Sequence, residues 1–192
     1  MFVCFPENLL SNMYLCSSCL AHIFDVDLMF HMNNASYLTH AELARWEYSA
    51  FNGTLASSFR DRSFFIVTAS MIRFRREVPP LKRFDIETRL LGIDDKNLWV
   101  YQTFHNNNGN ERGKVLAQIL TQAVVAKGGK VINPRSWVEQ NFPAAKDELD
   151  DLSIGYSKDD VDSLFDEKVM QFTHLEQVLR QSAASYDEKV VK

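Results

Sequence analysis

The residues best able to carry out chemistry lie close together near the N-terminal end of the chain. They are two carboxylates, one imidazole and two adjacent amides: Asp25, Asp27, His31, Asn33 and Asn34. A carboxylate in such a loop can attack a carbonyl carbon or activate a water molecule. If a helix starts directly after the amides, its free N–H groups and positive dipole end can polarise a carbonyl oxygen. The segment therefore suits attack on an ester or thioester, with the helix start stabilising the developing oxyanion.

The element that must position this segment is a helix predicted over residues 35–52. Asn34 is the predicted N-cap, and Gly53 stands where a left-handed residue ends a helix. The apolar side chains recur about every 3.6 positions, which predicts one buried face. The stripe is strongly aromatic, and its members are Tyr37, Ala41, Ala44, Tyr48 and Phe51.

Strand-like runs make up most of the chain between the helix and residue 127. They are rich in β-branched and aromatic residues, and turn-like polar segments separate them. One helix beside several hairpin-connected strands predicts an α+β fold in which the helix covers one face of an antiparallel sheet. The second face then needs cover, which a partner chain would supply. The predicted strands are 18–24, 64–77, 84–93, 98–107 and 114–127.

Composition limits the function classes. The chain has 192 residues, of which 46% are hydrophobic, so it suits one globular domain with a tail. Residues 144–192 hold 12 acidic and 6 basic residues, while the rest of the chain holds 13 acidic and 15 basic ones. A nearly neutral body does not suit nucleic-acid binding. No apolar run approaches the ~18 residues of a membrane span, so we expect a soluble, cytoplasmic protein.

Three cysteines raise the question of a metal site. Cys16, Cys19 and His22 form one short cluster, and Cys4 stands apart. A structural zinc site normally joins two such clusters, so we rank a zinc module far behind and expect no metal and no cofactor. The odd, low cysteine count is typical of a reducing compartment.

The C-terminal part changes character after residue 143. Residues 146–160 are acidic and poor in aromatics, which indicates a solvated linker. Residues 161–179 carry a second helical stripe, whose apolar face either packs on the domain or binds a partner. The expected layout is an irregular segment 1–17, a domain 18–143, and an acidic linker with an amphipathic helix over 144–192.

The loop and its helix match a known pattern. The run from Asp25 to Tyr37 resembles the acidic loop and central helix of hotdog-fold proteins in the branch around the 4-hydroxybenzoyl-CoA thioesterases. Within that branch it is similar to the animal proteins called thioesterase superfamily member six. The likeness covers roughly residues 18–127. It also includes Ala41, Glu42, Ala44, Arg45, Ala69-Ser70, Arg73 to Arg76, Phe84-Asp85, Thr88 to Gly92 and Asp94-Asp95.

The resemblance implies a fold, an assembly and a site. The fold would be a long central helix wrapped by a curved antiparallel sheet, here with an extra C-terminal helix. Homodimers, or dimers of dimers, would place the active site at the subunit interface. Asp27 would be the catalytic carboxylate, and a backbone N–H near Asn34 would hold the thioester carbonyl. The type and place of His31 suit either a residue that orients the carboxylate or contacts substrate, or one that only stabilises the loop. The substrate-binding candidates are Asn33 and Tyr37, with Arg73, Arg75 and Arg76. These arginines, with Lys82 and Arg83, form the densest basic group, which is either a solvated strand end or a site for the phosphates of coenzyme A.

The expected function is hydrolysis of a fatty acyl-CoA thioester to the free acid and coenzyme A. One departure from the family pattern bears on it: Phe30 stands where the family commonly has glycine before the His-x-Asn-Asn run. The alternative is a non-catalytic hotdog protein that binds acyl groups or a protein partner. Membership of a fold family does not by itself settle activity.

Overall fold

A computed structural model describes residues 14–146 and residue 149 of the chain. All described elements belong to the first of two units, which ends at residue 153. None of the described helices combines the length and the hydrophobicity that a bilayer-spanning segment requires. The C-terminal helix predicted over residues 161–179 lies outside the described residues.

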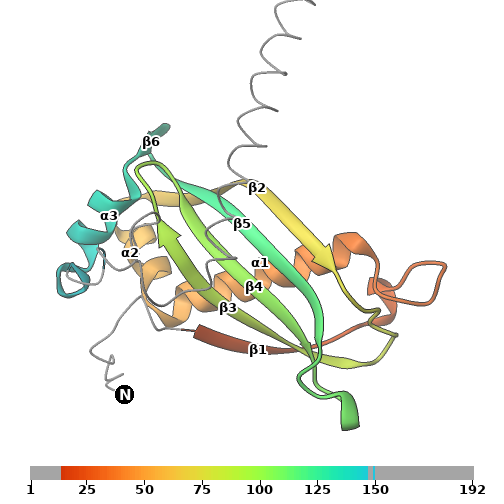
Figure 1. The fold of residues 1–192 in the computed structure, drawn as a ribbon. Helices are drawn as coiled ribbons and strands as arrows, with labels where there is room; N and C mark the ends of the chain where they lie inside the picture. Colours follow the sequence, from red (N-terminus) through yellow and green to blue (C-terminus); the bar gives the residue numbers. More distant parts are fainter. Residues whose placement is uncertain (1–13, 147–148, 150–192) are drawn as a thin grey trace, which may run out of the picture. The chain divides into compact units, whose positions relative to one another are not determined.

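An antiparallel sheet forms the body of the domain, and the long helix α1 lies along one of its faces (Figure 1). Five strands follow one another in the order β1-β3-β4-β5-β2, and a short sixth strand, β6, pairs with β5. This arrangement confirms the predicted α+β class. The strands are β1 Tyr14–Leu20, β2 Ser63–Phe74, β3 Arg83–Ile93, β4 Leu98–Asn106, β5 Val115–Lys127 and β6 Lys130–Ile132.

Helix α1 spans Asn34–Phe51 and buries the predicted aromatic and alanine stripe, except for Phe51, which is exposed. The N-cap is Asn33, one residue earlier than predicted, because its side-chain oxygen accepts hydrogen bonds from the first-turn N–H groups. Gly53 has a φ of 80°, as predicted for the helix end.

The core falls into two hydrophobic clusters. One lies between α1 and the sheet and includes Tyr37, Phe84 and Phe104, of which the two phenylalanine rings stack 5.6 Å apart. The other gathers around Trp137 on helix α3. That second cluster includes Leu149, which is 1% exposed, so core packing continues beyond the boundary expected at residue 143.

Two short helices and a strand start depart from the prediction. Residues 54–61, for which no element was predicted, form helix α2 (Thr54–Asp61), whose buried residues are serines and so gave no apolar stripe. Helix α3 (Pro134–Asn141) was missed although Asn133 caps it and Pro134 opens it. The first strand begins at Tyr14, inside the segment expected to be irregular, and a 3₁₀ turn occupies Ile23–Asp25.

Candidate active site

The acidic segment forms a tight hairpin just before α1. Val26 and Met32 form an antiparallel bridge, and the N–H of Asp27 donates to the carbonyl of His31 at 3.0 Å. The N–H of Phe30 donates to the carbonyl of Asp27 at 3.1 Å, which closes a turn. Phe30 has a φ of 59°, the left-handed conformation that glycine adopts most readily. The backbone at this position therefore suits the glycine that the family resemblance led us to expect there.

The carboxylate of Asp27 is partly accessible. One oxygen, Oδ1, accepts the N–H of Met29 at 2.8 Å, which fixes the side chain over the turn. The other, Oδ2, lies 3.7 Å from Nδ1 of His31, beyond hydrogen-bond distance. The Asp27 side chain is 36% exposed and that of His31 is 29% exposed. The structure therefore brings these two predicted residues together and leaves Oδ2 open to a reactant.

The two asparagines at the start of α1 have different roles. Oδ1 of Asn33 accepts the N–H groups of Ala35 at 2.7 Å and of Ser36 at 3.2 Å. The Asn33 side chain is thereby engaged in capping. Within the described part of the chain, the N–H of Asn34 has no acceptor, so it remains a donor at the positive end of the helix.

Asp25 fastens the same loop to the domain. Its Oδ2 accepts the N–H of His22 at 2.8 Å and lies 3.1 Å from Nε2 of His40 on α1, while its carbonyl accepts the N–H of Asn33 at 2.7 Å. Burial alone would raise the pKa of Asp25, but the hydrogen bonds from His22, His40 and Ser36 outweigh it and lower the pKa. Asp25 thus acts as an anchor, in contrast to the open carboxylate of Asp27.

The predicted arginine segment lies beside the helix start. The hydroxyl of Tyr37 donates to the carbonyl of Arg76 at 3.4 Å, and the N–H of Met32 donates to the carbonyl of Val78 at 2.8 Å. Tyr37 itself is 3% exposed, and burial together with the charge of Glu77 raises its pKa to about 12. The Tyr37 side chain packs within the core. Its contact with substrate remains a prediction.

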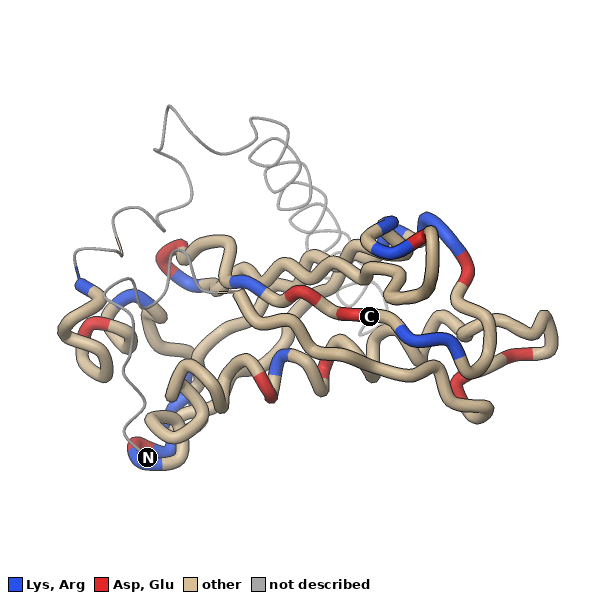
Figure 2. The backbone as a smooth tube through the Cα atoms, turned by 90° about the horizontal axis from the view of Figure 1, so that it is seen from below, with Lys and Arg blue, Asp and Glu red and all other residues tan. Residues whose placement is uncertain are grey.

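The three arginines differ in how firmly they are held. Arg75 donates through Nε to Gln118 at 3.2 Å, and Arg76 donates to the carbonyl of Val115 at 2.7 Å. Arg73, on β2, is exposed. Acidic and basic positions are interspersed along the described backbone (Figure 2). The positive charge that a phosphate could contact here therefore comes from these three neighbouring arginines.

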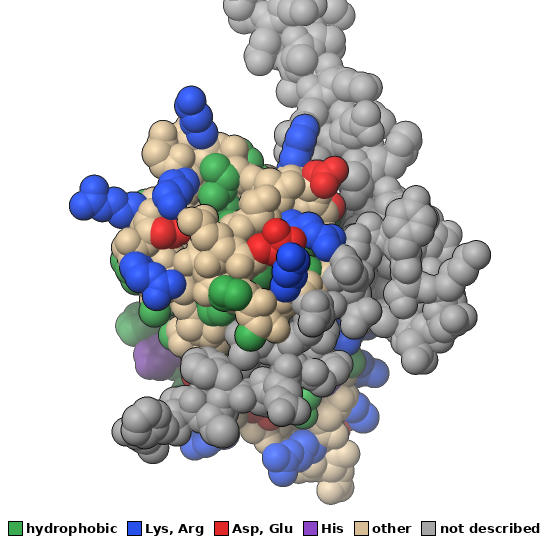
Figure 3. Space-filling view, turned by 90° about the vertical axis from the view of Figure 1, so that its left-hand side faces the viewer, with side chains coloured by type: hydrophobic (Ala, Val, Ile, Leu, Met, Phe, Trp, Pro, Cys, Tyr) green, Lys and Arg blue, Asp and Glu red, His purple; other side chains and the backbone are tan. Residues whose placement is uncertain are grey.

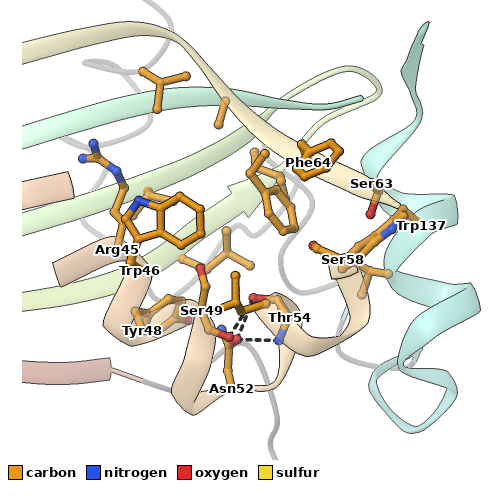
Figure 4. Close-up of a pocket in the computed structure, with 18 of the residues that line it drawn as sticks. Arg45, Trp46, Tyr48, Ser49, Asn52, Thr54, Ser58, Ser63, Phe64 and Trp137 are labelled. Atoms are coloured by element: carbon orange, nitrogen blue, oxygen red, sulfur yellow. Dashed lines mark hydrogen bonds between the residues drawn. The ribbon is translucent and has the colours of Figure 1, made fainter. Parts of the chain in front are cut away.

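A pocket of about 190 Å³ lies between the second half of α1, helix α2, the start of β2 and the sheet. Most of its wall is apolar. Figure 4 shows Arg45 and Trp46 at one end and Ser58, Ser63 and Trp137 at the other. A cavity of ~150 Å³ holds benzene, so this pocket has room for an apolar group of roughly eight carbons. The apolar residues at its wall include Leu55, Phe64, Phe65, Val67, Leu90 and Val100.

Arg45 joins this pocket to a buried polar network. Its NH1 donates to Oε1 of Gln102 at 2.7 Å and to Oγ1 of Thr121 at 3.3 Å, and its NH2 donates to Glu42. Gln102 is fully buried, and its amide nitrogen donates to the carbonyl of Ala41 and to Thr88. The pair formed by Arg45 and Glu42 is thus half inside the domain: the Arg45 side chain is only 15% exposed and that of Glu42 is 46% exposed.

The cysteines of β1 do not form a site together. Cys16 and Cys19 are three positions apart on a strand, so their side chains point to opposite faces of the sheet. Burial, and next the charge of Glu47, raise the pKa of Cys19 to about 11, which disfavours its thiolate. Within residues 14–146 and 149, no three potential ligands converge on one point for a metal ion. Cys4 lies outside that part.

A central helix on one face of this antiparallel sheet, with an acidic hairpin at the helix start, defines the hotdog-fold class. Residues 22–142 match the thioesterase-like superfamily, and the chain belongs to that family. The resemblance found in the sequence is thereby confirmed.

Individual proteins show the same relationship. The chain is 38% identical over 80 residues to the protein THEM6 of Xenopus laevis, which covers 42% of this chain and 39% of that protein. It is 40% identical over 82 residues to the THEM6 protein of Drosophila melanogaster, covering 42% of each. The matched part is therefore about two fifths of these relatives.

The fold likeness extends to solved structures. The probable thioesterase YbaW of Escherichia coli superimposes with a TM-score of 0.56 at 20% identity, covering 67% of this chain and 96% of that one. At this identity the likeness concerns the fold alone.

Proposed function

We propose that this protein hydrolyses acyl-CoA thioesters, with Asp27 as the catalytic carboxylate. Water loses a proton to Oδ2 of Asp27 as its oxygen attacks the thioester carbon. The carbon–sulfur bond then breaks, and the proton is returned to the leaving thiolate of coenzyme A. The N–H of Asn34 stabilises the oxyanion. The observation that carries the proposal is the open Oδ2 of Asp27, whose other oxygen, Oδ1, accepts the Met29 N–H directly before the start of α1.

The site is completed by a second copy of the chain, joined through β2. In the described part β2 pairs only with β5, and its exposed apolar side chains include Ile66 and Met71. A long apolar edge strand left uncovered is an aggregation hazard. A two-fold axis along this edge would continue the sheet antiparallel across the interface. We propose a homodimer of this kind as the working unit.

This dimer would bring the acidic loop of one protomer to the pocket of the other. The start of β2 lines the pocket through Phe64 and Val67. The end of β2 lies by the helix start, since the ring of Phe74 packs 5.1 Å from that of Tyr37. Antiparallel pairing places the start of one β2 beside the end of the other. The acyl group would lie in the pocket and the thioester near the partner's loop.

Coenzyme A would be held by the arginine segment. Arg73, Arg75 and Arg76 are exposed and lie on the segment that contacts the first turn of α1. Arginine pairs well with phosphate because its planar guanidinium donates two parallel hydrogen bonds. Replacing all three by Gln should raise KM for an acyl-CoA while leaving kcat within a few fold.

The test is thiol release from a panel of acyl-CoAs of increasing chain length. Asp27→Asn keeps the shape but removes the basic oxygen, so kcat should fall by about 10² to 10⁴. His31→Ala should have a smaller effect, and Asp25→Asn smaller still. Asp95→Asn, in an exposed turn, is the control and should match the parent. If Asp27→Asn turns over as fast as the parent, Asp27 has no place in the mechanism.

The alternative function is binding of acyl groups without turnover. Phe30 favours it, because this exposed, bulky residue takes the left-handed backbone conformation that suits glycine in the acidic hairpin. A parent protein that releases no thiol from any acyl-CoA, yet melts higher in the presence of octanoyl-CoA, would support binding alone.

A further inference from the structure

The acidic hairpin ends in a tip of exposed apolar side chains. Leu28 is 97% exposed, Met29 74% and Phe30 78%, and these three tip residues directly follow Asp27 in the sequence. A group of large apolar side chains that is exposed in this way marks an interaction surface. Residues 23–32 also hold two acidic residues and no Lys or Arg. The tip therefore suits a partner surface that is apolar and positively charged.

A surface of this character lies at the mouth of the pocket, where α2 leads into β2. Phe59 and Phe64 line the pocket and are 66% and 58% exposed, so the pocket is open on this side. Two exposed cations, Arg60 and Arg62, follow Phe59 in the sequence. The face over α2 and α3 shows apolar side chains separated by Lys and Arg (Figure 3). The mouth thus matches the tip in both apolar character and charge.

The tip cannot reach the mouth of its own pocket. The hairpin precedes α1 and α2 follows it, so the two surfaces lie at opposite ends of a helix of 18 residues (Figure 1). At roughly 1.5 Å per residue, this helix is about 27 Å long. Only the tip of another copy of the chain can therefore cover the mouth.

The proposed β2 dimer brings that second copy to the right place. β2 begins directly after α2 and ends beside the start of α1, where Phe74 packs against Tyr37. The hairpin extends past this end of β2 (Figure 1). Antiparallel pairing about a two-fold axis sets the end of one β2 beside the start of the other, and every contact then occurs twice. Each tip would lie at the pocket mouth of the partner.

We propose that Leu28, Met29 and Phe30 of one protomer dock on Phe59 and Phe64 of the partner subunit and close its pocket. This inference rests on the proposed function and deepens it, because each acyl-binding site is then built from two chains. The tip shields the acyl chain from bulk water, and Asp27, directly before the tip, is brought to the thioester. The ring of Phe30, which stands where the family resemblance led us to expect glycine, adds apolar surface to this contact.

The first experiment joins the two surfaces chemically. In full-length chains whose three native cysteines are replaced by Ser, Leu28→Cys and Phe59→Cys are introduced singly and together, and a short bismaleimide is added. The double variant should give a covalent dimer of twice the 22.1 kDa chain mass. Each single variant should give none, because a two-fold axis holds the two tips at opposite ends of the paired β2 strands. Leu28→Cys with Tyr14→Cys is the matched control, since Tyr14 is 65% exposed but lies on β1, at the edge of the sheet opposite β2. A monomeric parent, or a dimeric double variant that does not cross-link, would overturn the proposal.

The dissociation constant of the dimer gives an independent measure by sedimentation. Phe30→Ser and Phe59→Ser should each weaken the dimer by about tenfold or more, because each removes an apolar ring from the contact. The double variant should be little weaker than either single variant, since both rings belong to the same contact. Tyr14→Ser should leave the dimer unchanged. Fully additive effects of Phe30→Ser and Phe59→Ser would show that the two rings do not touch.

A binding measurement separates this inference from the catalytic proposal. Calorimetry with octanoic acid needs no turnover, and Phe30→Ser, at a concentration that keeps it dimeric, should bind the acid about tenfold more weakly than the parent. Equal binding would mean that the tip does not close the pocket. Cross-linking together with the loss of binding, but without thiol release from any acyl-CoA, would support the docking and refute hydrolysis. Thiol release that depends on Asp27, in a dimer whose tip and mouth do not cross-link, would leave the proposed function standing and refute the docking.

Discussion

Asp25 and His40 are linked across the acidic loop and the central helix, with Oδ2 and Nε2 3.1 Å apart. The two side chains are 19% and 15% exposed, and the His40 ring also packs edge-on against Phe84 at 5.2 Å. His40 is thereby held by the core on one side while it holds the loop on the other. The position of Asp27, two residues along, depends on this link.

Asp25→Asn should destabilise the domain in a pH-dependent way. The pKa of Asp25 is lowered in the folded state, so its ionised form favours folding. The contribution is present above the ordinary carboxyl pKa of about 4 and is lost as the pH falls through the lowered value. We expect a loss of about 1 to 2 kcal/mol at pH 7, typical of hydrogen bonds to a charged group.

Urea unfolding at pH 7 and at several acidic pH values measures this difference. The gap between parent and Asp25→Asn should narrow steadily below pH ~4. Asp95→Asn is the matched control and should show no gap at pH 7. If the difference in unfolding free energy stays constant down to the lowest pH measured, the charge of Asp25 does not contribute to stability.

Phe30 gives a second prediction, on backbone strain. A left-handed conformation costs a residue with a Cβ about 1 kcal/mol or more relative to glycine. Phe30→Gly and Phe30→Ala both remove the ring, which is 78% exposed, but only the alanine keeps the Cβ. Phe30→Gly should therefore melt higher than Phe30→Ala by a few degrees. Equal melting temperatures would mean that the loop relaxes out of this conformation.

The elements with strong periodicity could be predicted from the sequence. Helix α1 and strands β2 to β5 are long, and their apolar residues face a core at regular spacing. Helix α2 could not be found in this way because it buries Ser57 and Ser58, residues that ordinarily mark loops. The first strand was predicted at 18–24 but spans Tyr14–Leu20. Its apolar and polar residues alternate only weakly, which is tolerated because β1 lies at the edge of the sheet.

The site was predictable only where its residues are adjacent in sequence. Asp27, His31 and Asn34 lie in one hairpin and helix start, so their proximity follows from spacing. The partner of Asp25 is His40, which is 15 residues away in the sequence. The sequence feature that could have indicated it is the position of His40 one helical turn after Tyr37, on the buried side of α1. The reach of Arg45 to Gln102 depends on strand register, which no local pattern specifies.

The Arg45–Gln102 contact supports a third prediction. Arg45→Met removes the donor to a fully buried Oε1, which should cost about 2 kcal/mol. Gln102→Leu should cost a similar amount, since it removes the buried acceptor of Arg45 and the donor to the Ala41 carbonyl and Thr88. The double variant should cost clearly less than the two single changes together, because neither group is then left unpaired. Thermal or urea unfolding of the parent, the two single variants and the double variant measures the coupling between Arg45 and Gln102. Arg112→Met, at an exposed position, is the control. Strict additivity would contradict direct coupling.

The edge of β2 that no described strand pairs with supports the last prediction, on assembly. Light scattering of the parent at micromolar concentration should give twice the 22.1 kDa mass of one chain. Met71→Lys places a charge on the exposed apolar side of β2, and a two-fold axis would bring two such charges close together, so the dimer should weaken by tenfold or more. Val131→Lys is the matched control, because Val131 is also an exposed apolar residue but lies on β6. It should leave the dimer intact. If the parent is monomeric, or if both variants dissociate alike, β2 is not the interface. Dissociation by Met71→Lys alone, with a parallel loss of thiol release, would place the active site between two copies of the chain.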